Sequence, residues 1–419
     1  MKRNERIIGW IGVVLVLVLG KNLLANDMLF FRLLVGLGIG YALSRSYAGF
    51  AGAANRAFRT GSTKLMRSLM GLFIGASLIT IAFMFSSEPG DYNMFVNPIN
   101  LGLIFGAALF GFGMAFSSCC ASGVFTDLVT GLPRAIITLI FFSVGAFVAY
   151  PVGKLSIVSD SWFSSATGAE GSGGVFFPDL FKWDGTGGYL GAFILTLVLA
   201  GIVVWISYLY ERSRKVNNTY TGVLSEDVQD KPDDFDSKDY ELLSETTYDR
   251  LFAKPWTLRQ GFSLLTAMYA ILLGVTKSGW GVSGPFAIWF GKFLMIFGVS
   301  PEALSSYSTI SEEALTTPFF QNAVTVQNMG IMLGTLLFLL TAGEFKKMFT
   351  AELKITGREA ALFALGGFAM GAGTRFAKGC NAGALFTPIA NFSLAGWVFL
   401  VAMVGGAYIG NTCAKKWAK

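Results

Sequence analysis

Two cysteines occupy matching places in the two halves of this chain of 419 residues. Cys120 lies in residues 111–123, which read G-x-G-x-x-F-x-x-x-C-x-x-G, and Cys380 lies in the same pattern at residues 371–383, 260 positions later. Each pattern follows an apolar stretch long enough to cross a membrane. A duplicated thiol at a break in a transmembrane segment predicts a transport path built at the interface between two repeats.

The residue types around these cysteines fit a soft, sulfur-bearing ligand. A thiol is a weak donor and a weak acceptor, whereas phosphate or nitrate would call for arginine clamps. Each cysteine precedes a short apolar segment that we interpret as a half-helix, whose unpaired N–H groups would attract an anion. Gly123 and Gly383 would allow a sharp turn or a close approach to the ligand. We therefore place Cys120, Cys380 and these two glycines on the path; the alternative for each thiol is a small, inert core residue.

Two polar neighbours and a third cysteine extend this set. Asn381 follows Cys380 and could donate two N–H bonds to an oxyanion. Cys119 has no counterpart, because Gly379 occupies the matching position, so it is either a neighbour of the path or a packing residue. Asp127 would oppose an anion if it lined the path, and we expect it to face water or to cap a helix.

Four basic residues lie close to the predicted breaks. Arg45 and Lys277 match each other across the repeat, while Arg375 and Lys378 flank Cys380. Cations within a membrane are costly and usually have a function, so we include all four among the candidate path residues. The alternative for Arg45 and Lys277 is that their side chains reach the lipid headgroups.

The composition predicts a membrane protein with many spans. Hydrophobic residues make up 53% of the chain and charged residues 14%, against about a quarter in soluble domains. The chain has no histidine, which excludes an imidazole base, a histidine-ligated haem and histidine proton relays, and it has no Walker A loop. We expect no cofactor, no metal, no nucleic-acid partner and no enzymatic activity.

Hydropathy predicts ten spans, of which the first is a retained helix. Basic loops place the N-terminus inside. Four shorter apolar segments suit re-entrant half-helices shielded by protein: 48–59, 119–131, 281–297 and 380–391. Hydropathy leaves open whether 281–297 crosses fully. The spans are 7–25, 28–44, 65–86, 98–116, 133–153, 187–210, 259–276, 324–343, 359–377 and 393–412.

Three motifs recur in the same order in both halves. Besides the cysteine pattern, they are M-G-x-x-x-G at 70–75 and 329–334, and a [ST]-[RK]-S-x-x-G-x-x-G pattern at 44–52 and 276–284. Each repeat then holds four spans, with one further span between the repeats, so the second repeat enters from the opposite side. The predicted fold is an all-α polytopic membrane protein with inverted-topology repeats and re-entrant half-helices. The alternative is a coincidence of small-residue packing motifs.

The domain organisation follows from this repeat. A loop with ten acidic residues at 226–249 is interpreted as a solvated linker, with a docking site for a cytoplasmic partner as the alternative. The predicted units are an N-terminal helix (1–27), a first repeat (28–153), an outside loop (154–186), a linking helix (187–210), an acidic cytoplasmic loop (211–258) and a second repeat (259–419).

At these motifs the chain resembles the YeeE/YedE family of bacterial sulfur-compound transporters, whose characterised activity is thiosulfate uptake. The resemblance rests on residues 111–123 and 371–383, with support from 276–285 and 328–330. It implies an hourglass-like protein in which central thiols pass thiosulfate along by S–H···S contacts. The family's importers also use a cysteine in an earlier re-entrant loop, and the corresponding stretch here, 44–55, has none.

The resulting prediction is a multi-pass transporter of the bacterial cytoplasmic (inner) membrane that imports thiosulfate or a related sulfur-containing anion. Its partners would be that small anion, the lipid bilayer and, as a candidate, a cytoplasmic sulfur-carrier protein. Uptake of a selenium compound or another small sulfur species stays open as an alternative. So do a membrane sulfur-transfer or redox protein and an aquaporin-like channel for neutral solutes.

Overall fold

A computed structural model describes residues 2–170, 173–231, 241 and 244–417. The described part is almost entirely helical, with two isolated β-bridges and no strand. It contains nine helices that are long and apolar enough to cross a membrane. The predicted class, an all-α polytopic membrane protein, is confirmed.

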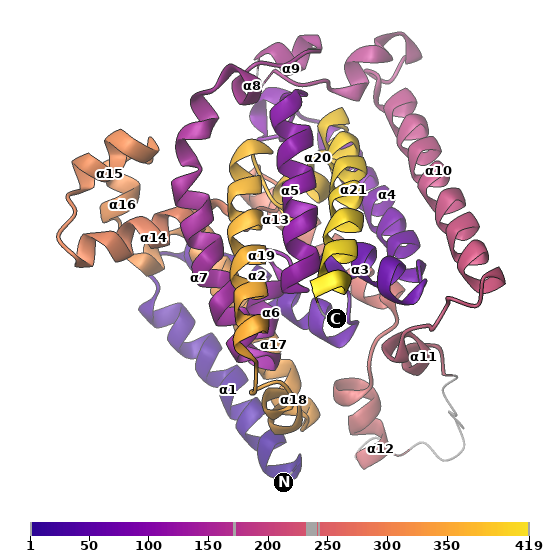
Figure 1. The fold of residues 1–419 in the computed structure, drawn as a ribbon, viewed down its shortest axis with the longest axis vertical. Helices are drawn as coiled ribbons and strands as arrows, with labels where there is room; N and C mark the ends of the chain where they lie inside the picture. Colours follow the sequence, from indigo (N-terminus) through magenta and orange to yellow (C-terminus); the bar gives the residue numbers. More distant parts are fainter. Residues whose placement is uncertain (1, 171–172, 232–240, 242–243, 418–419) are drawn as a thin grey trace.

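The long helices stand side by side in one bundle (Figure 1). In the first half they are α1 (Lys2–Leu23), α2 (Asp27–Arg45), α4 (Lys64–Met84), α5 (Leu101–Ser117) and α7 (Leu132–Val148). After the linking helix α10 (Tyr189–Val216) follow α13 (Leu258–Thr276), α17 (Ala323–Ala342), α19 (Gly357–Phe376) and α21 (Leu394–Trp417). These ten helices coincide with the ten predicted spans, and α5, with 17 residues, is at the lower limit of a bilayer span.

Short helices occupy the four segments predicted to be re-entrant. They are α3 (Phe50–Thr60), α6 (Gly123–Thr130), α14 (Gly284–Ile296) and the pair formed by the π-helix η8 (Asn381–Phe386) and α20 (Thr387–Ala390). Other short helices lie in the connections: α8 (Ser156–Ser159), α9 (Ala166–Glu170), α11 (Leu224–Asp230), α12 (Glu245–Tyr248), α15 (Pro301–Ser308), α16 (Glu312–Thr316) and α18 (Phe345–Ala351).

The position of α14 shows whether residues 281–297 cross the membrane, a question that hydropathy left open. α13 ends at Lys277, whose Nζ donates to Tyr92 in the loop after α4. α17 ends beside the start of α1, where Lys2 pairs with Glu344. With 13 residues, α14 is about 20 Å long, which is less than the roughly 30 Å of a hydrocarbon core. The segment therefore enters and leaves at one side. We call the face that carries the N-terminus inner and the opposite face outer.

Helices from the two halves pack against each other in matched pairs. α2 packs on α17 as α4 packs on α13, and α5 packs on α21 as α7 packs on α19. α5 and α19 lie against each other with glycines at the contact: a Cβ on Gly106 or Gly373 would lie 2.7 Å from the carbonyl oxygen of the other. Gly113 and Gly366 repeat this contact seven residues, or about two turns, away, at 2.5 and 2.7 Å. Inverted repeats related by a two-fold axis would produce this pattern; the repeat itself stays a prediction.

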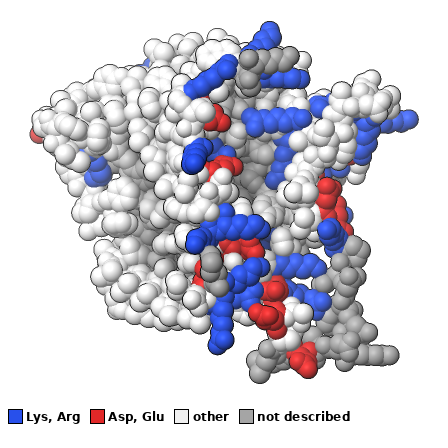
Figure 2. Space-filling model, turned by 60° about the horizontal axis from the view of Figure 1, so that its bottom comes forward, with Lys and Arg blue, Asp and Glu red and all other residues white. Residues whose placement is uncertain are grey.

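The linker after α10 lies on the inner face. Glu226 and Asp230 of α11 pair with Arg56 and Lys64, and Arg6 of α1 pairs with residues of the α12 region. Figure 2 shows this face, with basic side chains spread across it and acidic ones between them. Part of the predicted acidic loop, residues 232–240 and 242–243, lies outside the described residues. The described part is attached to the bundle by ion pairs.

Replacement of Gly111 tests the close packing of α5 on α21. A Cβ at this position would lie 2.0 Å from the carbonyl oxygen of Met403, so the Gly111→Ala change must push the helices apart. We expect a loss of about 2 kcal/mol of stability, seen as a lower melting temperature of the detergent-solubilised protein. Gly405→Ala is the control, because nothing lies within 4 Å of a Cβ there. Equal melting temperatures would contradict the packing described.

Candidate functional site

The Cys120 thiol is held where the chain breaks between α5 and α6. Ser118 ends α5 in the left-handed conformation, with φ of 60°, which turns the chain back into the bundle. Cys120 is 1% exposed, and its Sγ accepts the Gly123 N–H at 3.4 Å and lies 3.4 Å from Ser122 Oγ. The backbone N–H of Ala51, in the first turn of α3, also points to this sulfur. The thiol therefore lies where two short helices begin.

The surroundings of Cys380 repeat this geometry in the second half. Lys378 has φ of 55°, as its counterpart Ser118 has 60°, and Cys380 is the N-cap residue of η8. Cys380 is 1% exposed. The Cys120 thiol lies within electrostatic range of the Cys380 thiol, which in turn is within range of the Arg375 guanidinium. The structure thus brings together two thiols that are 260 residues apart in the chain.

Two buried polar side chains near Cys380 keep an unused hydrogen-bonding atom. Asn381 is 1% exposed and contacts Met114 Sδ through Nδ2 at 3.2 Å, while its Oδ1 has no partner among the described residues. The indole nitrogen of Trp280, before α14, is likewise buried without a described partner. Its ring lies 5.9 Å from those of Phe50 and Phe386. Buried polar atoms normally have partners, so this N–H is available to a ligand or a water molecule. Sequence reasoning missed Trp280, because no local pattern marks a single unpaired indole.

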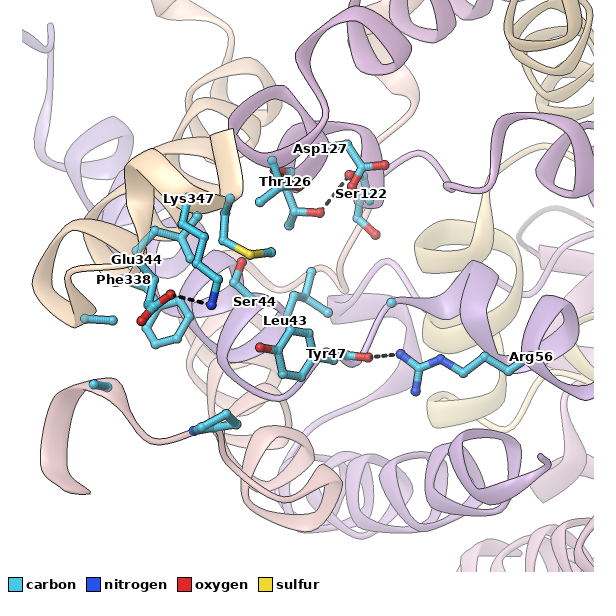
Figure 3. A pocket seen from close by; sticks show the side chains of 18 residues that line it. Leu43, Ser44, Tyr47, Arg56, Ser122, Thr126, Asp127, Phe338, Glu344 and Lys347 are labelled. Carbon is cyan, nitrogen blue, oxygen red and sulfur yellow. Dashed lines mark hydrogen bonds and ion pairs between the residues drawn. The ribbon is translucent and has the colours of Figure 1, made fainter. Parts of the chain in front are cut away.

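Two adjoining cavities open beside the thiols on the inner side. One, of about 310 Å³, is lined by Cys119 and Cys120 together with residues of α3 and α6. The other, of about 430 Å³, shares Gly123 and Asp127 with the first and reaches α17 and α18 (Figure 3). We call the two together the inner vestibule. Cys119, which the sequence left as either a path neighbour or a packing residue, lines it.

Most charged side chains of the vestibule form ion pairs. Arg56 lines both cavities and pairs with Glu226 at 3.0 Å, while its other terminal nitrogen donates to the Tyr47 carbonyl at 2.6 Å (Figure 3). Asp127, expected to face water or cap a helix, lines both cavities and pairs with Arg134 at 3.3 Å. The vestibule therefore presents hydrogen-bonding groups with little unbalanced charge.

Arg59 and Glu344 complete these vestibule charges. Arg59 lines the smaller cavity and donates to the Ala115 carbonyl at 2.7 Å, which caps the end of α5 next to the cysteines. Arg56 and Arg59 lie on one face of α3, and this spacing of three residues could have identified them from the sequence. Burial works to raise the pKa of Glu344, but hydrogen bonds from Lys2 and Lys347 hold that pKa below its usual value.

Three predicted cations lie on the outer side of Cys380. Lys277 and Lys378 are exposed, and Lys277 Nζ lies 4.3 Å from the Tyr92 ring centroid. Arg375 is half-buried; its Nη2 donates to the Ser283 carbonyl at 3.0 Å and its guanidinium lies 4.8 Å from the Tyr150 ring centroid. An anion arriving from outside would meet the two lysines before Arg375.

The two motif glycines face different neighbours. A Cβ on Gly123 would lie 3.4 Å from Cys120 Sγ, so this glycine keeps space open next to the thiol. A Cβ on Gly383 would lie 3.7 Å from the ring of Phe95, in the outer loop before α5. Phe95 has φ of 56°, a left-handed conformation that is strained for an aromatic residue. The Phe95 ring therefore lies against the first turn after Cys380, and no sequence motif indicated this contact.

Arg45 lies among backbone carbonyls instead. It is 2% exposed, donates to the carbonyl oxygens of Lys254 and Arg250 at 3.0 and 3.1 Å, and lies 4.6 Å from the Trp256 ring centroid. It does not line either cavity of the inner vestibule among the residues described there. These contacts hold the segment before α13 against α2, and we leave Arg45 out of the path proposed below.

A comparison with known proteins identifies the family. A family model described as "Sulphur transport" matches residues 45–409, which is most of the chain and includes both cysteine motifs. The chain belongs to the sulphur-transport family. The resemblance to the YeeE/YedE proteins is confirmed, and the nine apolar helices of the described residues are those of a multi-pass membrane protein.

Three relatives of this sulphur-transport protein are informative. "Probable transporter YedE" of Salmonella typhimurium LT2 is 33% identical over 138 residues, which is 33% of this chain and 32% of the relative. "Probable transporter YedE" of Escherichia coli K12 is 31% identical over the same number of residues. These matches span about a third of the length of the two relatives. "Thiosulfate transporter TsuA" of Spirochaeta thermophila is 25% identical over 388 residues, 90% of this chain and 97% of the relative.

Thiol labelling tests the burial of the cysteines in this sulphur-transport protein. Cys119, Cys120 and Cys380 are buried, whereas Cys413 at the inner end of α21 is half-exposed. We expect a charged maleimide to attach to Cys413 alone in the folded protein and to all four thiols after unfolding, as counted by intact-protein mass spectrometry. The Cys413→Ser variant should carry no label until it is unfolded. Rapid labelling of Cys120 or Cys380 in the folded variant would contradict the closed site.

Proposed function

We propose that this protein imports thiosulfate or a related sulfur-containing anion through a path on which Cys120 and Cys380 are the central groups. The observation that carries the proposal is the pair of buried thiols held within range of each other at the starts of short helices. The full-length similarity to a protein named as a thiosulfate transporter supports the substrate class.

The chemistry of the thiols favours a ligand with a terminal sulfur. A neutral thiol can donate its S–H to a soft, charged sulfur and can accept a weak hydrogen bond in return. Because each of these contacts is weak, the ligand can leave the site again. An ionised thiolate would repel an anion, so in this proposal the thiols act in the neutral form. The N–H groups of Ala51 and Gly123 at Cys120 add partial positive charge without a fixed cation.

The cations then order the path from outside to inside. Lys277 and Lys378 are exposed and attract the anion, and Arg375 together with the Trp280 indole N–H receives it near Cys380. From Cys120 the anion enters the inner vestibule beside Cys119. Arg56 is already paired there and Arg59 already donates to the Ala115 carbonyl, so the anion meets no unengaged arginine on leaving.

Two thiols are sufficient in this proposal. The stretch 44–55 has no cysteine, and the backbone N–H of Ala51 in that stretch points at Cys120 instead. A selenium compound or another small sulfur species would use the same contacts. The basic inner face is consistent with the bacterial cytoplasmic membrane as the location and with release toward a cytoplasmic sulfur-carrier protein.

Growth on thiosulfate tests the role of the thiols. In a host that cannot import thiosulfate, expression of this protein should restore growth on thiosulfate as the sole sulfur source. Cys120→Ser and Cys380→Ser should each abolish growth, because a hydroxyl is a hard group that holds sulfur poorly, while immunoblots show unchanged expression. Cys413→Ser, at the end of α21, is the matched control and should grow as the wild type does.

The outcomes show whether the proposed substrate or the proposed cysteine path is wrong. Full growth of both path variants would refute the cysteine path. If the wild type fails on thiosulfate but takes up another sulfur or selenium compound, and Cys120→Ser abolishes that uptake, the path stands with a different substrate. Labelled sulfur bound covalently to the protein during turnover would support sulfur transfer instead of passage.

Replacement of Arg375 tests the outer receiving site. Arg375→Gln removes the positive charge near Cys380, and hydrogen bonds to charged groups contribute about 1.5–3 kcal/mol. The thiosulfate concentration for half-maximal uptake into cells should rise about tenfold or more. Lys182→Gln, an exposed outer cation that pairs with Asp179, is the control and should change it less than twofold. Equal values for both variants would remove Arg375 from the path.

A further inference from the structure

A large hollow lies between α4, α10 and α13 at the inner end of the bundle. Its volume is about 1160 Å³, larger than most small-molecule pockets, and we call it the inner groove. α10 stands at the edge of the bundle (Figure 1), and only about a fifth of the residues in its most apolar stretch are buried. The groove belongs neither to the vestibule nor to the thiol site, because its lining residues are different.

The wall of the groove on α4 is flat and open. Gly71 and Gly75 line it, and nothing lies within 4 Å of a Cβ built on Gly71. A Cβ on Gly75 would touch only Thr266, at 3.5 Å. Leu72, Val204 and Phe262 supply apolar surface beside these glycines. Within a bilayer, such an open apolar channel must be filled by a hydrocarbon chain.

The inner end of the groove carries basic side chains. Arg259, the second residue of α13, is exposed, and its guanidinium has no ion-pair or hydrogen-bond partner among the described residues. Arg67 is held by Glu211 at 2.8 Å and by the Tyr208 ring, whose centroid lies 4.2 Å away. Lys64 pairs with Asp230 at the rim. Lys64 and Arg67 are thus each paired with a carboxylate, and Arg259 leaves an excess of one positive charge at the groove.

A second hollow at the outer end of α4 and α10 has the opposite charge balance. Its volume is about 830 Å³, and its lining includes Glu88 and Asp179 against the single cation Lys182. The outer hollow offers a similar apolar surface without the cations. The charge difference between the two hollows therefore indicates a ligand with a negative headgroup in the inner one.

We propose that the inner groove binds an anionic phospholipid of the inner leaflet. Its phosphodiester lies between Lys64, Arg67 and Arg259, and one acyl chain lies along Gly71 and Gly75. Basic pockets between transmembrane helices at the cytoplasmic side bind acidic headgroups in this way. The bound lipid fills the space between α10 and α4, and so joins the linking helix to the first half. This inference does not depend on the transported substrate.

Lipid binding to the purified protein tests this site. Native mass spectrometry would compare dioleoyl phosphatidylglycerol with dioleoyl phosphatidylethanolamine, which has the same chains but no net charge. We expect tighter binding of phosphatidylglycerol, and Arg259→Gln should weaken it about fivefold, which corresponds to about 1 kcal/mol. Gly71→Leu should remove one binding event for either lipid, because its side chain fills the acyl channel.

The chain offers a matched control for each variant. Arg358 matches Arg259 in position: each is the exposed second residue of a helix that starts at the inner end with a threonine capping box. Arg358 lies outside the groove, so Arg358→Gln should leave lipid binding unchanged. Gly405 is another membrane glycine with nothing within 4 Å of its Cβ, and Gly405→Leu should also have no effect.

Three results would overturn the proposal. The first is equal binding of the two lipids, with no effect of Arg259→Gln. The second is a dimer that Gly71→Leu converts to a monomer without any change in bound lipid, because the groove would then hold a second copy. The third is displacement of phosphatidylglycerol by millimolar glycerol phosphate, since a site that depends on the acyl chain would not release its lipid to a soluble headgroup.

Discussion

Four short helices begin or end inside the bundle, where lipid offers no partner for their unpaired N–H and C=O groups. Polar side chains supply the missing partners. Asn55 donates to the Met114 carbonyl at 3.0 Å at the end of α5, and Asn328 donates to the Val282 carbonyl at 3.0 Å before α14. The first of these bonds lies at the break that holds Cys120, and the second lies at the break before α14.

The close contacts between glycines make this arrangement possible. α5 and α19 touch through glycines at two levels, so their backbones approach closely over much of their length. Such contact leaves little room for lipid or water between the halves. The vestibule on the inner side is polar instead, and Arg56 and Asp127 in its lining form ion pairs. At the site, close helix packing around the thiols therefore adjoins a polar cavity on the inner side.

Hydropathy and spacing were sufficient to predict much of this structure. All ten spans and all four short segments correspond to helices, since long apolar runs and glycine-rich breaks are local signals. The repeated motif predicted that Cys120 and Cys380 lie in matching breaks, and both are buried just before short helices. The partners of Arg45 and Arg375, the ring of Phe95 and the free indole of Trp280 could not be predicted. Each depends on which loops meet in space, and a single sequence carries no local signal for contacts between distant loops.

The matched pairing of helices also affects how this protein can be synthesised. α2 packs on α17 and α5 on α19, so these helices of the first half find their partners roughly 260 to 300 residues later in translation. At about 5–20 residues per second, the first half waits on the order of 10–50 s in the membrane with its glycine faces and polar breaks uncovered. During this interval it depends on the insertion machinery for protection. A ribosome that stalls within the second half would release an intermediate that the membrane's quality control can recognise by its exposed polar groups.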